Sequence, residues 1–488
     1  MKKVSGRAIF PLILAIVLLA GTALLCVRYF AKADEWVTFS GSPHVYTGVN
    51  LDGGVVYDRD GTLLLDSTDG RTYSADAVTR TATMHLLGDR YGYIQAPLLG
   101  SFADDMIGFD KINGLYGAEG TEANAALTLS AAAQTAAYQA LGNYHGTVGV
   151  YNYKTGEILC MVSGPSIDPS SDGDVPDGAY INRCINGSFT PGSIFKLITS
   201  AAAIENIKDI DSRRFTCAGS VDVAGVTVKC TGVHGSQTFE DALANSCNCA
   251  FAQISLELGA DTIESYAKKF GFLDSQSLSG IPTMAGSFTK GASGSANLAW
   301  SGIGQYEDLV CPYSMLRYVS ASVVEPSLLL DTPSGSTTSL LSTATANKLR
   351  DMMNYNVSAH YGTNRFPGLN LCAKTGTAEV GDGTSHAWFT GFLLDDAHPY
   401  AFVVLVENAG GGLTNAGAVA NTVLQADVLA DGGKITVSEN ITKTQLGLLP
   451  KDMQIKISAT AVQYNGFSEG EYTEEQRALA AWEAVKNK

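Results

Sequence analysis

The sequence has few basic side chains for its length. Its 488 residues include 32 Lys and Arg against 48 Asp and Glu, which gives a formal net charge of −16. An acidic surface repels phosphate groups, so the composition argues against a nucleic-acid partner and against attraction to anionic lipid heads. Charged residues make up only 16% of the chain and hydrophobic residues 45%. General disorder is therefore excluded, and two or three globular units are expected.

The sequence also lacks a repeat of fixed period, which argues against a solenoid. It lacks paired Cys-x-x-Cys motifs and a histidine cluster, so Cys247-Asn248-Cys249 does not predict a zinc site, and no cofactor or metal is expected. Eight of the nine cysteines follow residue 28. Cys217 and Cys230 flank a Gly- and Val-rich stretch that resembles a hairpin, where a disulfide would stabilise the fold by about 3 kcal/mol. The alternative, eight buried thiols, stays open.

One long hydrophobic run is present, from Ala8 to Val27, and it contains no charge. At about 1.5 Å per residue, such a helix spans a hydrocarbon core of about 30 Å. Three basic residues precede it: Lys2, Lys3 and Arg7. They predict a cytoplasmic N-terminus, a single membrane pass and an extracellular body. A signal peptide cleaved near Ala31-Lys32-Ala33 is a weaker alternative because the run is long for one. Lipidation at Cys26 is weaker still.

We expect four parts along the chain. Residues 1–33 form the cytoplasmic stub and the anchor, residues 34–126 a small spacer domain, residues 127–435 the main domain and residues 436–488 a polar C-terminal tail. Within the spacer, Gly53 to Asp66 reads as two short strands around a turn at Asp60-Gly61.

The main domain alternates helical and strand patterns. Helices are expected at 131–141, 194–205, 238–258 with an interruption near Ser246, 263–270 and 343–355. Strands are expected at 147–153, 157–163, 369–377, 386–394 and 400–407. Helices mixed with late hairpin strands predict an α+β fold with an antiparallel sheet flanked by helices and a helical subdomain.

A serine three residues before a lysine is a candidate nucleophile with its base, because a helix brings the two side chains to one face. The pattern occurs at Ser193/Lys196, Ser265/Lys268 and Ser287/Lys290. Pro191-Gly192 starts a helix just before Ser193, and Lys196 lies in an apolar helix whose burial favours the neutral amine. The second pair lies on a charged helix face and the third in a Gly-rich loop. We therefore select Ser193 and Lys196, against the alternative of a helix-start serine with a solvent-seeking lysine.

Two further short motifs complete the candidate site. Among three S-x-N matches, Ser246-Cys247-Asn248 interrupts a helical stretch, so Ser246 could pass a proton to a leaving amine and Asn248 could bind an amide. Helix capping is the alternative reading. There are two K-T-G matches. Lys154-Thr155-Gly156 is followed by Glu157, which would repel a substrate carboxylate. Lys374-Thr375-Gly376 is followed by Thr377, which would bind one.

Gly376 allows a substrate to approach the strand closely. The N–H of Thr377 could form an oxyanion hole with the N–H of Ser193.

The three motifs in this order are typical of penicillin-binding proteins and serine β-lactamases. The segments FTPGSIFK (189–196), SCN (246–248) and AKTGTAE (373–379) resemble class B penicillin-binding proteins. So do YDRDG (57–61), YNYKTGEILCMVSGPSIDP (151–169), IGQ (303–305), HAWFTGF (386–392) and VENAGGG (406–412). The resemblance covers about residues 53–430. The short segment after the anchor resembles the compact Gram-positive members, and Cys247 replaces the middle residue of S-D-N.

This resemblance implies a peptidoglycan D,D-transpeptidase. Ser193 would attack the D-Ala-D-Ala bond of a stem peptide with Lys196 as base, and Ser246 would protonate the leaving D-Ala. An amine of a neighbouring stem would then resolve the ester. β-Lactams would acylate Ser193, and a membrane glycan polymerase is an implied partner.

Three alternatives remain open. They are a β-lactamase or β-lactam sensor, for which an E-x-x-L-N motif is missing between Asn248 and Lys374, a D,D-carboxypeptidase, and a non-catalytic wall-binding scaffold.

Overall fold

The computed structural model describes residues 2–38, 46–47, 50–51, 53–68, 70–94, 102, 106–115, 124–320, 322–323, 328, 338–381 and 383–430. The chain divides into two units, Met1–Asp427 and Val428–Lys488. The predicted C-terminal tail, with the match Ser438/Asn440, lies outside the described residues. The predicted domain boundaries stay predictions.

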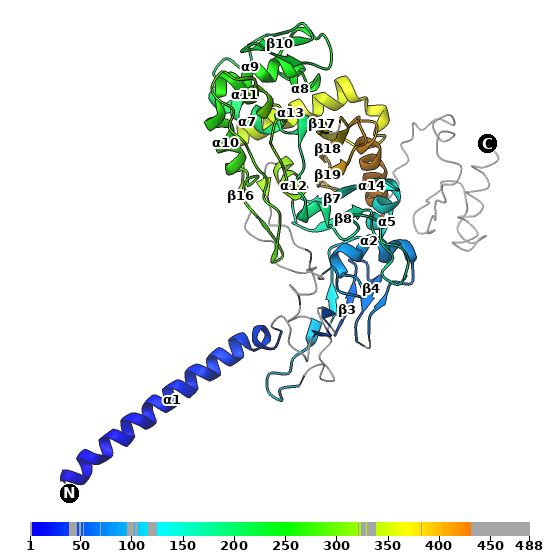
Figure 1. Ribbon diagram of the computed structural model, residues 1–488. Helices are drawn as coiled ribbons and strands as arrows, with labels where there is room; N and C mark the ends of the chain where they lie inside the picture. Colours follow the sequence, from blue (N-terminus) through cyan, green and yellow to red (C-terminus); the bar gives the residue numbers. More distant parts are fainter. Residues whose placement is uncertain are drawn as a thin grey trace, which may run out of the picture. The chain divides into compact units, whose positions relative to one another are not determined.

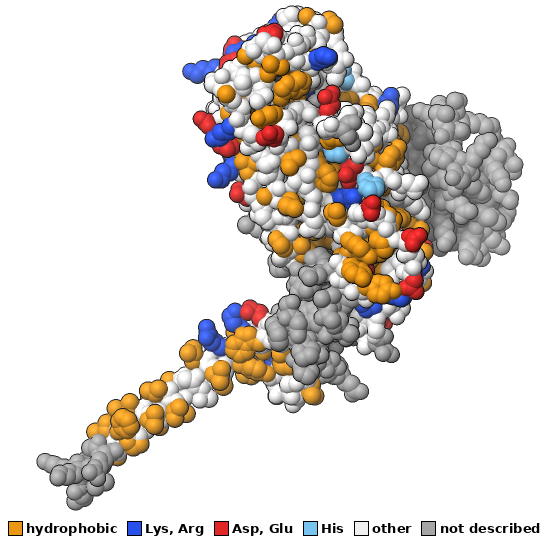
Figure 2. All heavy atoms as spheres, in the orientation of Figure 1, with side chains coloured by type: hydrophobic (Ala, Val, Ile, Leu, Met, Phe, Trp, Pro, Cys, Tyr) orange, Lys and Arg blue, Asp and Glu red, His pale blue; other side chains and the backbone are white. Residues whose placement is uncertain are grey.

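The first helix, α1 (Lys2–Val37), contains the predicted hydrophobic run. Within its segment Ala8–Ala33, an 18-residue stretch reaches a mean hydropathy of 2.7, and this is the one described helix that is long and apolar enough to cross a membrane. Its hydrophobic side chains are exposed along its length (Figure 2). An exposed apolar surface of this kind is stable in lipid and costly in water.

A small four-stranded sheet follows, in the order β5-β4-β3-β6. Its strands are β3 (Val55–Tyr57), β4 (Leu63–Asp66), β5 (Thr72–Tyr73) and β6 (Asn124–Ala126), and helix α2 (Ala77–Leu87) follows β5. The predicted hairpin between β3 and β4 is confirmed. Asp58 closes its turn by accepting from the N–H groups of Asp60 and Thr62, at 3.0 and 2.6 Å. The parallel pairing of β3 with β6 was not predicted, because it joins segments far apart in sequence.

The main domain is built on a five-stranded antiparallel sheet in the order β17-β18-β19-β7-β8. The strands are β7 (Gly146–Asn152), β8 (Ile158–Gly164), β17 (Leu371–Glu379), β18 (Ser385–Leu393) and β19 (Tyr400–Val406). All residues of β8 and β19 are buried. Strands covered on both faces read as continuous apolar runs, as these two do. The five predicted strands and the α+β fold are confirmed.

Helices cover both faces of this sheet (Figure 1). Helix α12 (Pro312–Val319) packs on one face, where Leu316 lies against Gly149. Helix α5 (Ala131–Leu141) packs on the other, where Gln134 accepts from the N–H of Met161. The last described helix is α14 (Ala416–Ala430).

A helical lobe forms beside β17 (Figure 1). It contains the turn η1 (Gly192–Ile194) and helices α7 (Lys196–Asn206), α8 (Phe239–Ala244), α9 (Asn248–Leu258), α10 (Ala260–Lys269), α11 (Ala296–Ser301) and α13 (Thr343–Tyr355), followed by η2 (Asn356–Tyr361) and η3 (Thr363–Arg365). Short strands edge it: β9 (Phe215–Cys217), β10 (Ser220–Val223), β11 (Val226–Lys229), β12 (Gly235–Gln237), β13 (Ser277–Leu278) and β14 (Ile281–Pro282). The remaining strands are β1 (Tyr46–Thr47), β2 (Asn50–Leu51), β15 (Ser322–Val323) and β16 (Thr338–Ser339).

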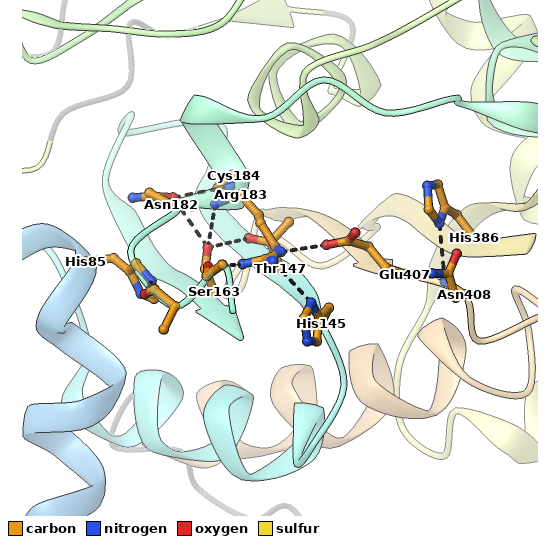
Figure 3. A network of polar contacts seen from close by, with 12 residues as sticks. His85, His145, Thr147, Ser163, Asn182, Arg183, Cys184, His386, Glu407 and Asn408 are labelled. Carbon is orange, nitrogen blue, oxygen red and sulfur yellow. Dashed lines mark hydrogen bonds and ion pairs between the residues drawn. The ribbon is translucent and has the colours of Figure 1, made fainter. Parts of the chain in front are cut away.

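A polar network at one end of the sheet positions the segment after β19 (Figure 3). Arg183, in the short helix α6 (Arg183–Asn186), donates through Nε to Glu407 at 2.5 Å and lies 3.3 Å from His145. Its N–H donates to Ser163 in β8. After Glu407 the chain continues to Gly412, which lies close to β17. A Cβ atom on Gly412 would lie only 2.4 Å from the carbonyl oxygen of Gly376. The network therefore holds a glycine segment against the K-T-G strand.

Candidate active site

The turn that carries Ser193 is fixed by contacts of the residues just before it. Gly192 has φ of 54°, and a Cβ there would lie 2.6 Å from the carbonyl oxygen of Thr377. Its N–H donates to the carbonyl of Gly304 at 2.7 Å. Trp388 in β18 donates through Nε1 to the carbonyl of Thr190 at 2.9 Å. These contacts hold Ser193 against β17, as the predicted helix start requires.

Lys196 is the first residue of α7 and is fully buried. Its Nζ lies 3.0 Å from Ser193 Oγ and donates to the carbonyl of Ser246 at 2.6 Å and to Asn248 Oδ1 at 2.7 Å. Burial lowers the pKa of Lys196 to about 7. A neutral amine has two N–H donors and one lone pair. The two carbonyl-type acceptors can take both donors, which leaves the lone pair for the Ser193 hydroxyl.

The S-x-N segment forms the break between α8 and α9. Ser246 has φ of 53°, and its Oγ lies 3.3 Å from Lys196 Nζ. Cys247, not Ser246, is the N-cap residue of α9, and it makes no side-chain cap hydrogen bond. The helix-capping alternative is therefore wrong for Ser246. Asn248 also donates to the carbonyl of Lys229 at 2.9 Å, so its amide is held from two sides.

Lys374 is more enclosed than a strand-edge cation would be. It is fully buried, and its Nζ donates to Ser246 Oγ at 3.0 Å and to the carbonyl of Thr375 at 2.8 Å. Burial, followed by the charge of Lys196, holds its pKa well below the usual value. One hydroxyl, that of Ser246, thus lies between two buried amines. Two adjacent ammonium groups would repel each other, so this arrangement favours one shared proton over two.

The open edge of β17 lies beside Ser193. The strand is at the end of the sheet, with Thr375 half-buried and Thr377 exposed. The N–H of Thr375 donates to the hydroxyl of Tyr361 at 3.1 Å, so it points away from β18. Residues two apart on a strand direct their N–H groups to the same side. The N–H of Thr377 therefore faces the same edge, where the predicted oxyanion hole requires it.

The competing motif matches lie elsewhere. Ser265 and Lys268 are exposed on α10. Lys290 pairs with Asp261 and Glu264, and Ser295 caps α11. Lys154 is exposed in the β7–β8 turn and pairs with Asp396. The structure thus brings together the eight residues that the sequence selected: Ser193, Lys196, Ser246, Asn248, Lys374, Thr375, Gly376 and Thr377.

The sequence did not point to Tyr361 as a site residue, and it pointed to Cys230 only as a possible disulfide partner of Cys217. Tyr361 lies in η2 and its hydroxyl lies 3.2 Å from Thr375 Oγ1. Cys230 follows β11, and its sulfur accepts from the N–H of Asn248 at 3.2 Å. Neither belongs to a short motif, and only the fold brings them to the site.

Comparison with known families matches residues 146–425 to the penicillin-binding protein transpeptidase domain. Among curated proteins, the chain is 29% identical over 318 residues to the peptidoglycan D,D-transpeptidase PbpA of Mycobacterium tuberculosis, covering 57% of this chain and 64% of that protein. It is also 29% identical over 366 residues to stage V sporulation protein D of Bacillus subtilis, covering 68% and 55%. The chain thus spans less than two thirds of the length of these two relatives.

Solved structures give the same result for the fold. The penicillin G acyl-enzyme complex of penicillin-binding protein A from M. tuberculosis superimposes with a TM-score of 0.61 at 25% identity. The alignment covers 78% of this chain and 99% of that one.

Proposed function

Because the chain belongs to the penicillin-binding protein transpeptidase family, we propose that it is a serine D,D-transpeptidase that cross-links peptidoglycan stem peptides. The observation that carries this proposal is the distance of 3.0 Å between Ser193 Oγ and the buried Lys196 Nζ. A nucleophile and base within hydrogen-bond reach, with the base held by further contacts, is the arrangement that nucleophilic catalysis requires.

The first half-reaction forms an ester. Ser193 Oγ attacks the carbonyl carbon of the penultimate D-Ala of a stem peptide, and its proton moves to the neutral Lys196 amine. The N–H groups of Ser193 and Thr377 stabilise the oxyanion. The C–N bond breaks, and the leaving D-Ala amine takes its proton through the Ser246 hydroxyl, which lies within 3.3 Å of Lys196 Nζ.

The second half-reaction transfers the acyl group. The amine of a neighbouring stem peptide attacks the ester carbonyl, Ser193 leaves and regains a proton, and a new amide bond forms the cross-link. Asn248 binds the substrate amide. Lys374, Thr375 and Thr377 favour the terminal carboxylate, with the threonines nearest to solvent and the buried lysine behind them. Gly376 keeps the strand edge open to the peptide.

β-Lactams would acylate the same serine, and the M. tuberculosis relative forms an acyl-enzyme complex with penicillin G. We further propose that α1 anchors the chain with its N-terminus in the cytoplasm and its catalytic domain outside. The basic residues before the apolar segment support this orientation. A glycan polymerase in the same membrane is the proposed partner, since cross-linking acts on newly made strands.

The test uses the full-length chain in detergent with a synthetic pentapeptide ending in D-Ala-D-Ala and an acceptor amine. We expect D-Ala release together with an amide-linked product, both lost in Ser193→Ala and both kept in Ser265→Ala. D-Ala release without an amide product would assign a carboxypeptidase. Absence of both from the folded protein would favour the wall-binding scaffold.

Steady hydrolysis of a β-lactam in the same preparation would favour the β-lactamase alternative. The E-x-x-L-N segment, which that activity would need between Asn248 and Lys374, is missing from the sequence.

A further inference from the structure

Three cysteines and one histidine meet directly behind the S-x-N turn. The sulfur atoms of Cys217, Cys230 and Cys247 and a ring nitrogen of His234 all lie within 4.8 Å of one another. Cys217 and Cys247 are buried, and Cys230 and His234 are half-buried. We call these four residues the Cys3His cluster. All described cysteines are free thiols, so of the two alternatives that the sequence left open, the Cys217–Cys230 disulfide is not formed.

The fold explains why sequence spacing did not reveal this cluster. Its ligand spacing is Cys-x12-Cys-x3-His-x12-Cys, far from the short pairs typical of zinc sites. The β10–β11 hairpin brings Cys230 back to Cys217, and the N–H of Cys230 donates to the carbonyl of Gly219 at 2.9 Å. Pairing of β9 with β12 sets Cys217 opposite Gly235, beside His234.

Two ligand–ligand distances from Cys230, to Cys247 and to His234, fit a tetrahedral ion. Bond lengths of about 2.3 Å for Zn–S and about 2.0 Å for Zn–N place tetrahedral ligand atoms about 3.5–3.8 Å apart. The sulfurs of Cys230 and Cys247 are 3.8 Å apart, and Cys230 Sγ is 3.6 Å from His234 Nδ1. A disulfide would need the two sulfurs at about 2.05 Å.

The surroundings suit thiolate ligands. The N–H of Asn248, the first residue of α9, donates to Cys230 Sγ at 3.2 Å. Hydrogen bonds of this kind orient metal ligands, and the positive end of a helix stabilises thiolate charge. Three thiolates, one neutral imidazole and Zn²⁺ carry a net charge of −1, which the N-terminus of α9 complements. The half-buried side of the cluster gives an ion a route in from solvent.

We propose that Cys217, Cys230, His234 and Cys247 bind one structural zinc ion that fixes the S-x-N turn. Cys247 lies between Ser246 and Asn248, so an ion bound to it fixes the backbone of both neighbours. Asn248 in turn contacts Lys196 Nζ at 2.7 Å. The four protein ligands fill all four coordination positions of the ion. The ion therefore has no open position for substrate and takes no part in bond making or breaking.

Zinc content is measured on the full-length chain, purified in detergent with a thiol reductant and without a metal-affinity step. We expect about one zinc per chain by elemental mass spectrometry. The variants Cys230→Ser and His234→Ala should lower zinc affinity by ~10-fold or more, since even outer contacts are worth that much. Cys160→Ser, which changes a buried cysteine in β8 outside the cluster, should keep its zinc.

Cobalt provides a second readout that does not depend on activity. After removal of zinc with a chelator, added Co²⁺ should give the charge-transfer and visible bands of tetrahedral thiolate cobalt, weakened in His234→Ala. Three free thiols at Cys217, Cys230 and Cys247 that bind neither zinc nor cobalt would overturn the site. A mass lower by two hydrogen atoms, with Cys230 in a disulfide, would overturn it as well.

The positioning role has its own test. Zinc removal should slow acylation of Ser193 by a fluorescent penicillin, and readdition of zinc should restore the rate. An unchanged rate would overturn the positioning role. Failure of the acyl-enzyme itself would appear as unlabelled protein with its zinc still bound, so the two proposals can fail separately.

Discussion

Replacement of Lys196 by alanine is the perturbation whose effect the site geometry defines most closely. The amine lies 3.0 Å from Ser193 Oγ, and two acceptors at 2.6 and 2.7 Å orient it. Lys196→Ala removes the base and leaves the nucleophile in place. A positioned general base contributes about 10²- to 10⁴-fold, or about 3 to 5 kcal/mol of transition-state stabilisation. We expect acylation to slow by at least ~10²-fold.

The pH dependence gives the same residue a second test. Burial lowers the pKa of Lys196 to about 7, and only the neutral amine accepts the Ser193 proton. The acylation rate should therefore fall as the pH drops below about 7 and level off above it. Lys196→Ala should lose this limb of the profile.

The assay is the rate of labelling of the full-length chain by a fluorescent penicillin, followed from about pH 5 to pH 9. The matched control is Lys268→Ala, which changes the exposed lysine of another S-x-x-K match and should leave rate and profile unchanged. Wild-type rates in the folded Lys196→Ala variant, or a profile that keeps its limb near pH 7, would refute the assignment of Lys196 as base.

Three further predictions concern labelling and stability, and two of them have a matched control. Lys374→Ala should slow labelling by about 10-fold or more, because it removes the amine that donates to Ser246 Oγ at 3.0 Å, whereas Lys154→Ala in the other K-T-G match should leave the labelling rate unchanged. Gly192→Ala should lower the free energy of unfolding by about 2 kcal/mol or more, since its φ is 54° and a Cβ would meet the backbone of β17; unchanged thermal unfolding with full labelling would contradict this. Arg183→Met should cost about 3 kcal/mol in chemical denaturation because it leaves Glu407 without its partner at 2.5 Å. Lys154→Met, at an exposed ion pair, should cost less than about 1 kcal/mol.

Much of the fold could be predicted because its strands and helices carry strong local patterns. Helices at Ala131–Leu141 and Thr343–Tyr355 have the predicted bounds. Strands β8 and β19 are largely apolar runs buried along their whole length, so their patterns have few competing interpretations. What could not be predicted is pairing over long sequence distances, such as β3 with β6, since no local pattern records which distant strand lies alongside.

The candidate site follows the same division. The residues around each S-x-x-K match distinguished Ser193 and Lys196 from the other two matches, because the sequence of a buried helix is less polar than that of an exposed one. Burial of Lys374 behind Ser246 could not be predicted, since it depends on how the helical lobe packs on β17. The Cys3His cluster was missed for a similar reason: a hairpin and a strand pair close its long spacings.

The most direct test of the central claim is the site of acylation. The full-length chain is incubated with a fluorescent penicillin, digested, and the labelled peptide identified by mass spectrometry. We predict one stable ester on Ser193, absent from Ser193→Ala and present in Ser265→Ala. A label on another residue, or no label on the folded wild-type chain, would contradict the acyl-enzyme mechanism.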